Sequence, residues 1–139
     1  MNLEEEYDDS DLELCIQKVD GRIHLPPVTS PEDEDPRWQA IITVSDHIFH
    51  GDKVAADRIW QEVKRWSRYN DQDFQCAIGV CLLEELLGEF FEDYFDEVEA
   101  LAISDHDFGY TFAHCWKLGR SELPANARRF DDLKSRVVI

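Results

Sequence analysis

Positive charge is scarce in this sequence. Its 14 Lys and Arg residues face 31 Asp and Glu residues, so the formal net charge is −17. A general nucleic-acid binder needs cations that replace the counterions along the phosphates, so this charge argues against that class of protein and equally against binding to anionic membranes. The same charge favours solubility and fast association with basic surfaces.

Several other signals are missing. No stretch approaches 18 uninterrupted apolar residues, so the sequence predicts no membrane-spanning helix. Residues 1–10 are acidic and contain no apolar core, which predicts the absence of a signal peptide and a cytoplasmic location. The four cysteines include no CxxC pair, which disfavours a zinc site or a thioredoxin-like site.

The composition divides the chain in two. Residues 1–36 hold four of the five prolines and 12 of the 31 acidic residues. We therefore predict an acidic N-terminal segment with a Pro-rich connector over residues 1–35 and a helical domain over residues 36–139. Asp20-Gly21 between two apolar runs predicts a short β-hairpin, because this dipeptide suits a type I′ turn. A helix from Ser10 to Val19 is the alternative.

From residue 36 onward the apolar residues follow the 3.6-residue period of an α-helix. We predict a mainly α fold, a compact bundle of five to six antiparallel helices. The stretch from Asp71 to Leu87 is apolar nearly all round, which is typical of a central, buried helix. We expect Gly88 to end it, Ser104 to cap a fifth helix that carries Trp116 and stops at Gly119, and a last helix to follow Pro124.

Acidic residues gather in the middle of the chain. Between Tyr69 and Trp116 there are 12 Asp or Glu residues and no Lys or Arg. On the predicted helix over residues 90–103 the acids lie opposite an apolar stripe, and no cation within that helix relieves their repulsion. This face is either an ordinary solvated surface or a docking face for a basic partner. The candidate partner-binding residues are Glu85, Glu89, Glu92, Asp93, Asp96, Glu97, Asp105 and Asp107.

Glu85 is unusual among these acids because it falls on the apolar side of its helix. A carboxylate there is costly unless it is paired or reaches water. We expect it to reach water near the helix end, or to pair with Arg128 or Arg129. A catalytic acid is the less favoured interpretation.

Candidate catalytic and metal sites are few. Asp46, His47 and His50 could share one side of a helix, but they lack the remaining ligands of known zinc-binding helices. No GxSxG motif, no Gly-rich phosphate loop and no Cys with a recognisable His partner occurs in the sequence. We therefore predict a protein that is not an enzyme and has no metal, no cofactor and no catalytic residues.

One stretch carries a resemblance. The segment 77–90 reads AIGVCLLEELLGEF, and Phe108 and Cys115-Trp116 follow it. Over residues 60–116 this arrangement resembles a family of small uncharacterised bacterial helical domains that have a Leu-Glu-x-Leu-Leu segment, an acid-rich helix, and then a Phe and a Trp. In size, charge and composition the chain also resembles the immunity proteins that neutralise bacterial toxins.

These observations lead to a functional hypothesis. The resemblance implies an immunity or inhibitor protein that binds a basic toxin, such as a nuclease, and it implies no catalytic residues. The alternatives are a nucleic-acid mimic that occupies the phosphate-binding groove of an enzyme, an adaptor subunit of a larger complex, and a metal-dependent enzyme that uses Asp46, His47 and His50. None of these hypotheses includes direct contact with nucleic acid or a membrane.

Overall fold

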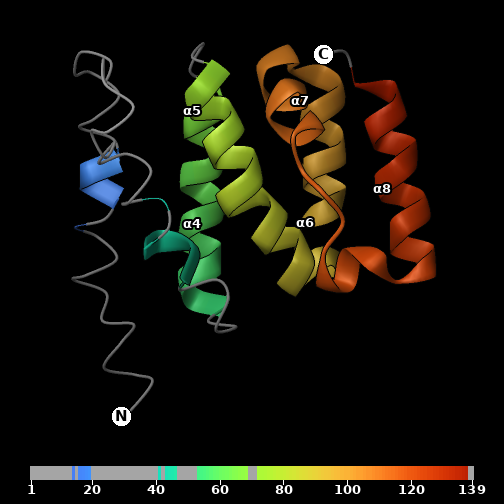
Figure 1. The fold of residues 1–139 in the computed structure, drawn as a ribbon, viewed down its shortest axis with the longest axis horizontal. Helices are drawn as coiled ribbons and strands as arrows, with labels where there is room; N and C mark the ends of the chain where they lie inside the picture. Colours follow the sequence, from blue (N-terminus) through green and yellow to red (C-terminus); the bar gives the residue numbers. More distant parts are fainter. Residues whose placement is uncertain are drawn as a thin grey trace, which may run out of the picture.

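The computed structural model describes residue 14 and residues 16–19, 41, 43–46, 53–68 and 72–137. Helices make up most of these segments, and no strand occurs among them, so the predicted mainly α class is confirmed for this part of the chain (Figure 1). Within the same residues no helix is both long and apolar enough to cross a membrane. The finer prediction, five to six antiparallel helices, stays a prediction, as does the division at residue 35.

Helix α4 spans Lys53–Trp66, as its apolar period predicts. The side chains of Ile59, Trp60, Val63 and Trp66 recur every three or four residues and are buried, so they form the single face that packs on the core. Its last turn carries the basic residues Lys64 and Arg65. Cations at this end are favoured by the negative end of the helix dipole.

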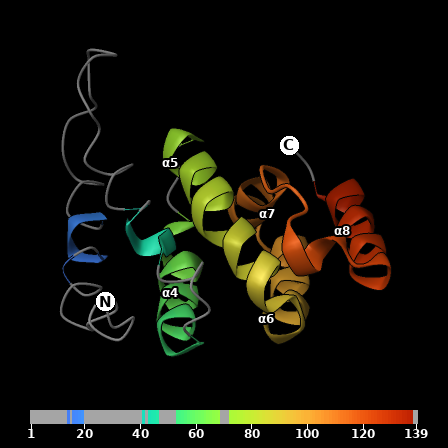
Figure 2. The same cartoon turned by 60° about the horizontal axis from the view of Figure 1, so that its bottom comes forward.

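The expected central helix is confirmed as buried. It consists of α5 (Gln72–Ala77), the π-helix η1 (Ile78–Leu83) and the start of α6 (Glu84–Ser104), which follow one another without a break as one long helical segment (Figure 2). η1 contacts α4, α7 and α6. Most of its aliphatic residues and those that follow it are inaccessible to solvent, and they are Ile78, Leu82, Leu83, Leu86 and Leu87. Val80 of η1 is half-buried.

The break after this helix differs from the expected one. Gly88 lies inside α6 and does not cap a helix; the non-helical backbone is at Phe90, with φ −136° and ψ 43°. Gly88 instead lies against the chain near Gly119: a Cβ added at Gly119 would be 2.5 Å from the Gly88 carbonyl oxygen. The glycine signal in the sequence therefore marks a close approach between two backbones, two residues before the kink.

Beyond the kink the chain forms α7 (His106–Ala113), an extended connector over residues 114–118, the 3₁₀ helix η2 (Gly119–Glu122) and α8 (Pro124–Arg136). The expected fifth helix thus ends at Ala113 and not at Gly119. Its cap is Asp105, whose carboxylate accepts a hydrogen bond from the backbone N–H of Phe108 at 3.1 Å, and not Ser104. The start of the last helix at Pro124 is confirmed, because proline suits the first helical turn.

The predicted N-terminal β-hairpin is wrong for its first strand. Residue 14 and residues 16–19 are helical, so this stretch follows the alternative interpretation, a helix ending at Val19. Ile16 and Val19 are buried and join the hydrophobic core. Burial of these two side chains, three residues apart, suits a helical turn, whereas a strand would place them on opposite faces. Asp20 and Gly21 lie outside the described residues.

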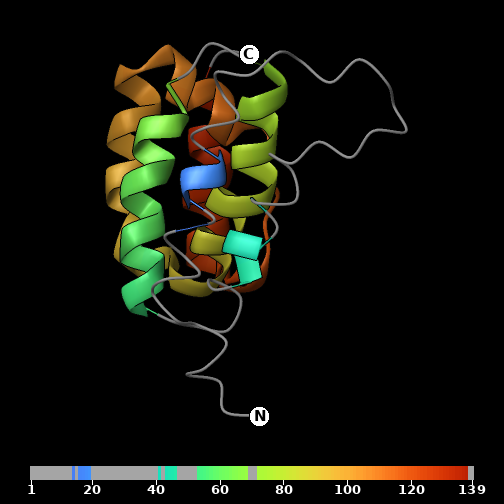
Figure 3. The ribbon, with the colours of Figure 1, turned by 90° about the vertical axis from the view of Figure 1, so that its left-hand side faces the viewer.

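Aromatic rings link the last three long helices. Phe91 and Phe95 of α6 stack with centroids 4.4 Å apart, Phe95 meets Phe112 of α7 at 6.4 Å, and Phe112 meets Phe130 of α8 at 5.0 Å. Figure 3 looks along the molecule with α4 and α5 in front of α6, α7 and α8. The ring series joins α6 to α7 and α7 to α8, so the aromatic face of α6 is turned inward and the acidic residues that follow Phe91 remain outside.

Candidate functional site

The acidic face of α6 is where the sequence suggests a docking surface. Phe91, Phe95 and Val98 are buried, as the amphipathic pattern predicts, so the acids between them face outward. Most of these acids are nevertheless not free. Cations from α4, η2 and α8 reach them, although no Lys or Arg lies within α6 itself.

The pair formed by Glu92 has the most specific geometry. The Arg120 guanidinium donates through Nε and Nη2 to the two carboxylate oxygens of Glu92, both at 2.7 Å, and Asn126 donates to Oε1 at 3.1 Å. The hydrogen bonds from Arg120 lower the pKa of Glu92 to about 2. Such a two-point contact fixes η2 against α6.

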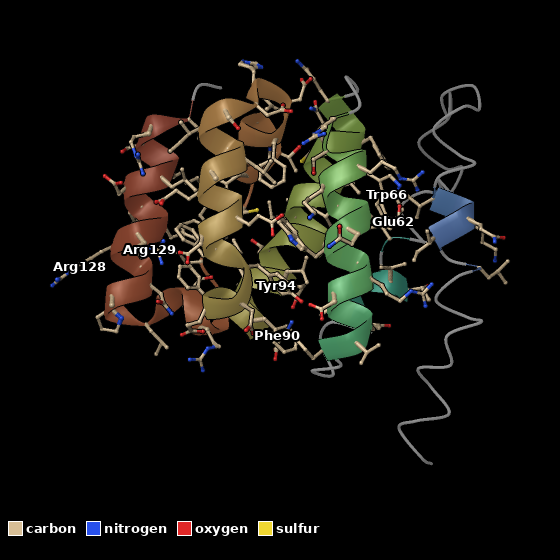
Figure 4. The ribbon with its side chains drawn as sticks, turned by 180° about the vertical axis from the view of Figure 1, so that it is seen from behind. Glu62, Trp66, Phe90, Tyr94, Arg128 and Arg129 are labelled. Atoms are coloured by element: carbon tan, nitrogen blue, oxygen red, sulfur yellow. The ribbon has the colours of Figure 1, made fainter. Side chains whose placement is uncertain are left out.

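Arg129 and Arg136 of α8 neutralise the next acids along α6. Arg129 donates to Asp96 at 2.7 Å and approaches Glu99 at 3.8 Å, and Arg136 donates to Glu99 at 3.2 Å. The Arg129 guanidinium also lies over the ring of Phe95, 4.7 Å from its centroid. Arg128, beside it in sequence, points away from the bundle (Figure 4). Of the alternatives for Glu85, a pair with Arg129 is therefore wrong, because Arg129 binds Asp96 and Glu99.

Glu97 faces the opposite neighbour, α4. Lys64 donates to it at 2.8 Å and the indole N–H of Trp60 at 3.1 Å. The hydrogen bond from Lys64 is the main cause of the lowered pKa of Glu97. This carboxylate thus satisfies a tryptophan N–H and ties two helices together.

Asp105 and Asp107 lie at the start of α7 and have structural partners. Besides capping the helix, Asp105 pairs with Arg68 at 3.3 Å. Asp107 lies beside the buried side chain of Gln75, whose amide nitrogen is 3.3 Å from the Asp107 carbonyl oxygen. Both aspartates therefore serve the junction of α7 with the preceding helices.

Glu85, Glu89 and Asp93 differ from the other predicted site residues. No side-chain carboxylate of the three forms a hydrogen bond or an ion pair within the part of the chain that the structure describes. Glu85 is half-buried, and its pKa is raised by burial first and then by the charges of Glu89 and Asp46. We call Glu85, Glu89 and Asp93 the unpaired acids.

A buried carboxylate that sequence reasoning did not place is Glu84. Its Oε1 accepts a hydrogen bond from the backbone N–H of Trp116 at 2.7 Å, and burial raises its pKa. Lys134 of α8 donates to the carbonyl oxygen of Cys115 at 2.6 Å, and the Cys115 thiol donates to the carbonyl oxygen of Gly79 at 3.3 Å. These contacts hold the connector over residues 114–118 against η1, α6 and α8.

Trp116 is the largest departure from the expected fifth helix. We expect the fifth helix to carry it, but α7 ends before it, and its side chain on the connector is 71% exposed. Lys134 lies over the ring, 5.4 Å from its centroid. The signal available in the sequence is Gly119, whose φ of +48° marks the end of the connector.

Two further polar clusters are structural in character. Tyr94 donates to Asp57 at 2.5 Å and accepts from Lys53 at 3.1 Å, and burial raises the pKa of Tyr94 to about 12, so this phenol stays protonated (Figure 4). A shallow depression of about 390 Å³ is lined by Gln61, Lys64, Arg65 and Arg68. Its cations pair with Glu97, Glu62 and Asp105, respectively.

The described residues contain no group of three or more His, Cys, Asp or Glu side chains placed to hold a metal ion, and His47 and His50 lie outside them.

Comparisons with known proteins identify no relative: no family model, no curated protein and no solved structure matches the chain.

Proposed function

We propose that this chain is an acidic protein-binding module that inhibits a basic partner protein, as an immunity protein neutralises a toxin. One observation carries the proposal: among the residues that the structure describes, cations pair with four of the eight acids of α6 but leave Glu85, Glu89 and Asp93 without an ion pair. For the fold we propose the bundle of five to six antiparallel helices, and for the setting the cytoplasm of a bacterium.

The unpaired acids favour a cationic ligand on energetic grounds. Glu85 and Glu89 are four residues apart on α6, so their charges repel each other, and burial adds to the cost at Glu85. A Lys or Arg side chain from a partner would relieve that repulsion, whereas the paired acids would first have to give up the Lys or Arg that each already binds. We therefore expect the unpaired acids to contribute more to binding than Glu92, Asp96 or Glu97.

The ion pairs within the chain also bear on the nucleic-acid mimic. A mimic needs a row of unpaired negative charges that replaces phosphates. Along α6 the carboxylates of Glu92, Asp96 and Glu97 are bound to Arg120, Arg129 and Lys64. We accordingly place the inhibitor first and the mimic after it.

The first experiment identifies the partner. The tagged chain is purified from its native host and co-purifying proteins are identified by mass spectrometry. The inhibitor hypothesis expects one small or medium-sized basic protein whose activity falls when the chain is added. A stable larger complex without loss of any activity would favour the adaptor instead.

The second experiment tests the unpaired acids. The association rate with that partner is measured over a salt series for the triple variant Glu85→Gln, Glu89→Gln and Asp93→Asn. A control with the same charge change carries Glu62→Gln, Glu122→Gln and Asp132→Asn. We expect slower association and a flatter salt dependence for the first variant, because exposed charges act mainly on the association rate. Equal effects in both variants would mean that only net charge matters, and the proposed site would be wrong.

A further inference from the structure

Trp116 is an exposed tryptophan on a segment whose backbone is held by hydrogen bonds. Trp116 is 71% exposed, and Leu118, two residues later on the same connector, is also exposed. Tryptophan is among the residues that contribute most to protein–protein binding, because it buries a large area at low conformational cost. Single exposed aromatic side chains are common on protein surfaces, so the residues around Trp116 decide whether it marks a binding surface.

The connector is held in one conformation by its neighbours. The backbone N–H of Trp116 binds Glu84, and the carbonyl oxygen of Cys115 binds Lys134. Further along, Leu118 packs on Gly88 of α6: its Cβ is 3.4 Å from the position that a Cβ on Gly88 would take. Binding here would therefore order little additional backbone, which lowers its entropic cost.

The connector runs along one side of α6 and is visible in Figure 1 between α7 and η2. It contacts Glu84 and Gly88. Glu85 and Glu89 each follow one of these residues, so their side chains lie about 100° further around the helix. Two of the unpaired acids are thus on the face of α6 next to the connector.

The cations near the connector already have partners. Lys117 binds Asp131 at 2.8 Å, and Arg120 binds Glu92. Lys134 binds a backbone carbonyl oxygen, and its charge lies close enough to Glu84 to offset part of the rise in the pKa of that carboxyl. Glu85 and Glu89 consequently provide the uncompensated charge on this surface, and that charge is negative.

We propose that Trp116, Leu118, Glu85 and Glu89 form one docking surface, and that its occupant is a partner segment with a large apolar side chain next to Lys or Arg. This inference rests on the proposed function and names the part of the molecule that carries it. The apolar side chain covers the Trp116 ring, and the cation meets Glu85 and Glu89. A second copy of the chain is a poor occupant, because each copy has a net charge of −17.

The test uses a synthetic amphipathic peptide of about 14 residues, made of leucine and lysine with the leucines on one helical face. A second peptide has serine in place of leucine and so keeps the charge. Affinity is measured by calorimetry at low and at physiological salt. Protection of Trp116 is measured by acrylamide quenching of tryptophan emission, with Trp116→Phe to isolate the signal of this residue.

For the intact protein we expect the leucine peptide to bind about tenfold more tightly than the serine peptide, and Trp116→Ala to remove that preference. The pair Glu85→Gln and Glu89→Gln should weaken both peptides about three- to tenfold, as expected for partly exposed ion pairs. Controls are Ile103→Ala, which removes another exposed apolar side chain, and the charge-matched pair Glu62→Gln with Asp132→Asn, whose partners Arg65 and Arg136 lie outside the connector. Each control should change affinity less than about twofold.

The outcomes separate the surface from the proposed function. If binding depends on Glu85 and Glu89 but not on Trp116, the docking surface is wrong and the acidic binding module stands. If neither peptide binds at low salt, both proposals fail. A dimer of the free protein in sedimentation experiments that Trp116→Ala abolishes would show that the surface joins two copies, which also overturns the inference.

Discussion

Replacing Glu84 tests how the connector is held. In Glu84→Ala the backbone N–H of Trp116 loses its acceptor in a site where Glu84 is only 7% exposed. A buried donor without a partner costs about 1–3 kcal/mol, so we expect the free energy of unfolding to fall by about 2 kcal/mol. Glu84→Gln keeps an oxygen that accepts this hydrogen bond and removes the charge, so its stability should stay within about 1 kcal/mol of the wild type.

The pH dependence of these variants gives a sharper test. Burial raises the pKa of Glu84 in the folded state above its unfolded value, so between the two values the native state binds more protons than the unfolded state. The contribution of this group to stability is therefore complete below the unfolded pKa and is lost as pH rises through the folded pKa. The amide of Glu84→Gln does not titrate, so this variant keeps that contribution at every pH. The free energy of unfolding of Glu84→Gln, relative to that of the wild type, should therefore increase from acidic to neutral pH.

The assay is urea unfolding followed by circular dichroism at a series of pH values from about 4 to 8, with the slope m checked for constancy. The emission maximum and acrylamide quenching of Trp116 report the connector directly. If Glu84→Ala and Glu84→Gln are equally stable at every pH, the hydrogen bond to Trp116 does not fix the connector and the reasoning fails.

Three further predictions concern the bundle. Phe95→Ala should cost about 3–5 kcal/mol in urea unfolding, because its buried ring joins α6 to α7, whereas Ile103→Ala at the surface should cost under about 0.5 kcal/mol. Gly119→Ala should lower stability by at least about 1 kcal/mol, since its φ is +48° and the α6 backbone blocks a Cβ; an unchanged melting curve would contradict this. The pKa of Glu92 is lowered to about 2, so the stabilisation from its pair with Arg120 is present above the unfolded pKa and is lost as pH falls through the folded pKa. Glu92→Gln should remove this pH-dependent stabilisation, which we expect to be under about 1 kcal/mol because the pair is exposed. The measurement is acid unfolding at low salt.

The sequence predicted the features that depend on local periodicity. The apolar period of α4 and the all-round apolar character of residues 78–87 identify buried helices, since burial on one face repeats every 3.6 residues. The start of α8 at Pro124 follows from the fixed φ of proline. These elements are determined by neighbours in the chain, so no tertiary information is needed.

The features that the sequence did not reveal depend on contacts between distant residues. Arg120 and Arg129 neutralise acids of α6 from about 30 residues away, and neither lies on that helix. Trp116 fits the apolar period of α7, but the helix ends before it because Glu84 and Lys134 hold the connector extended. A local pattern cannot distinguish these cases, because competition from tertiary hydrogen bonds decides them.

The most direct test of the central claim is a double-mutant cycle across the complex. Glu89→Gln is combined with removal of each partner cation in turn, and the coupling energy is obtained from the four dissociation constants. If the unpaired acids bind a basic partner, one cation should couple to Glu89 by more than about 1 kcal/mol, as close charge pairs do at interfaces. Coupling energies near zero for Glu89 with every partner cation, alongside a strong coupling for Glu92, would contradict the account.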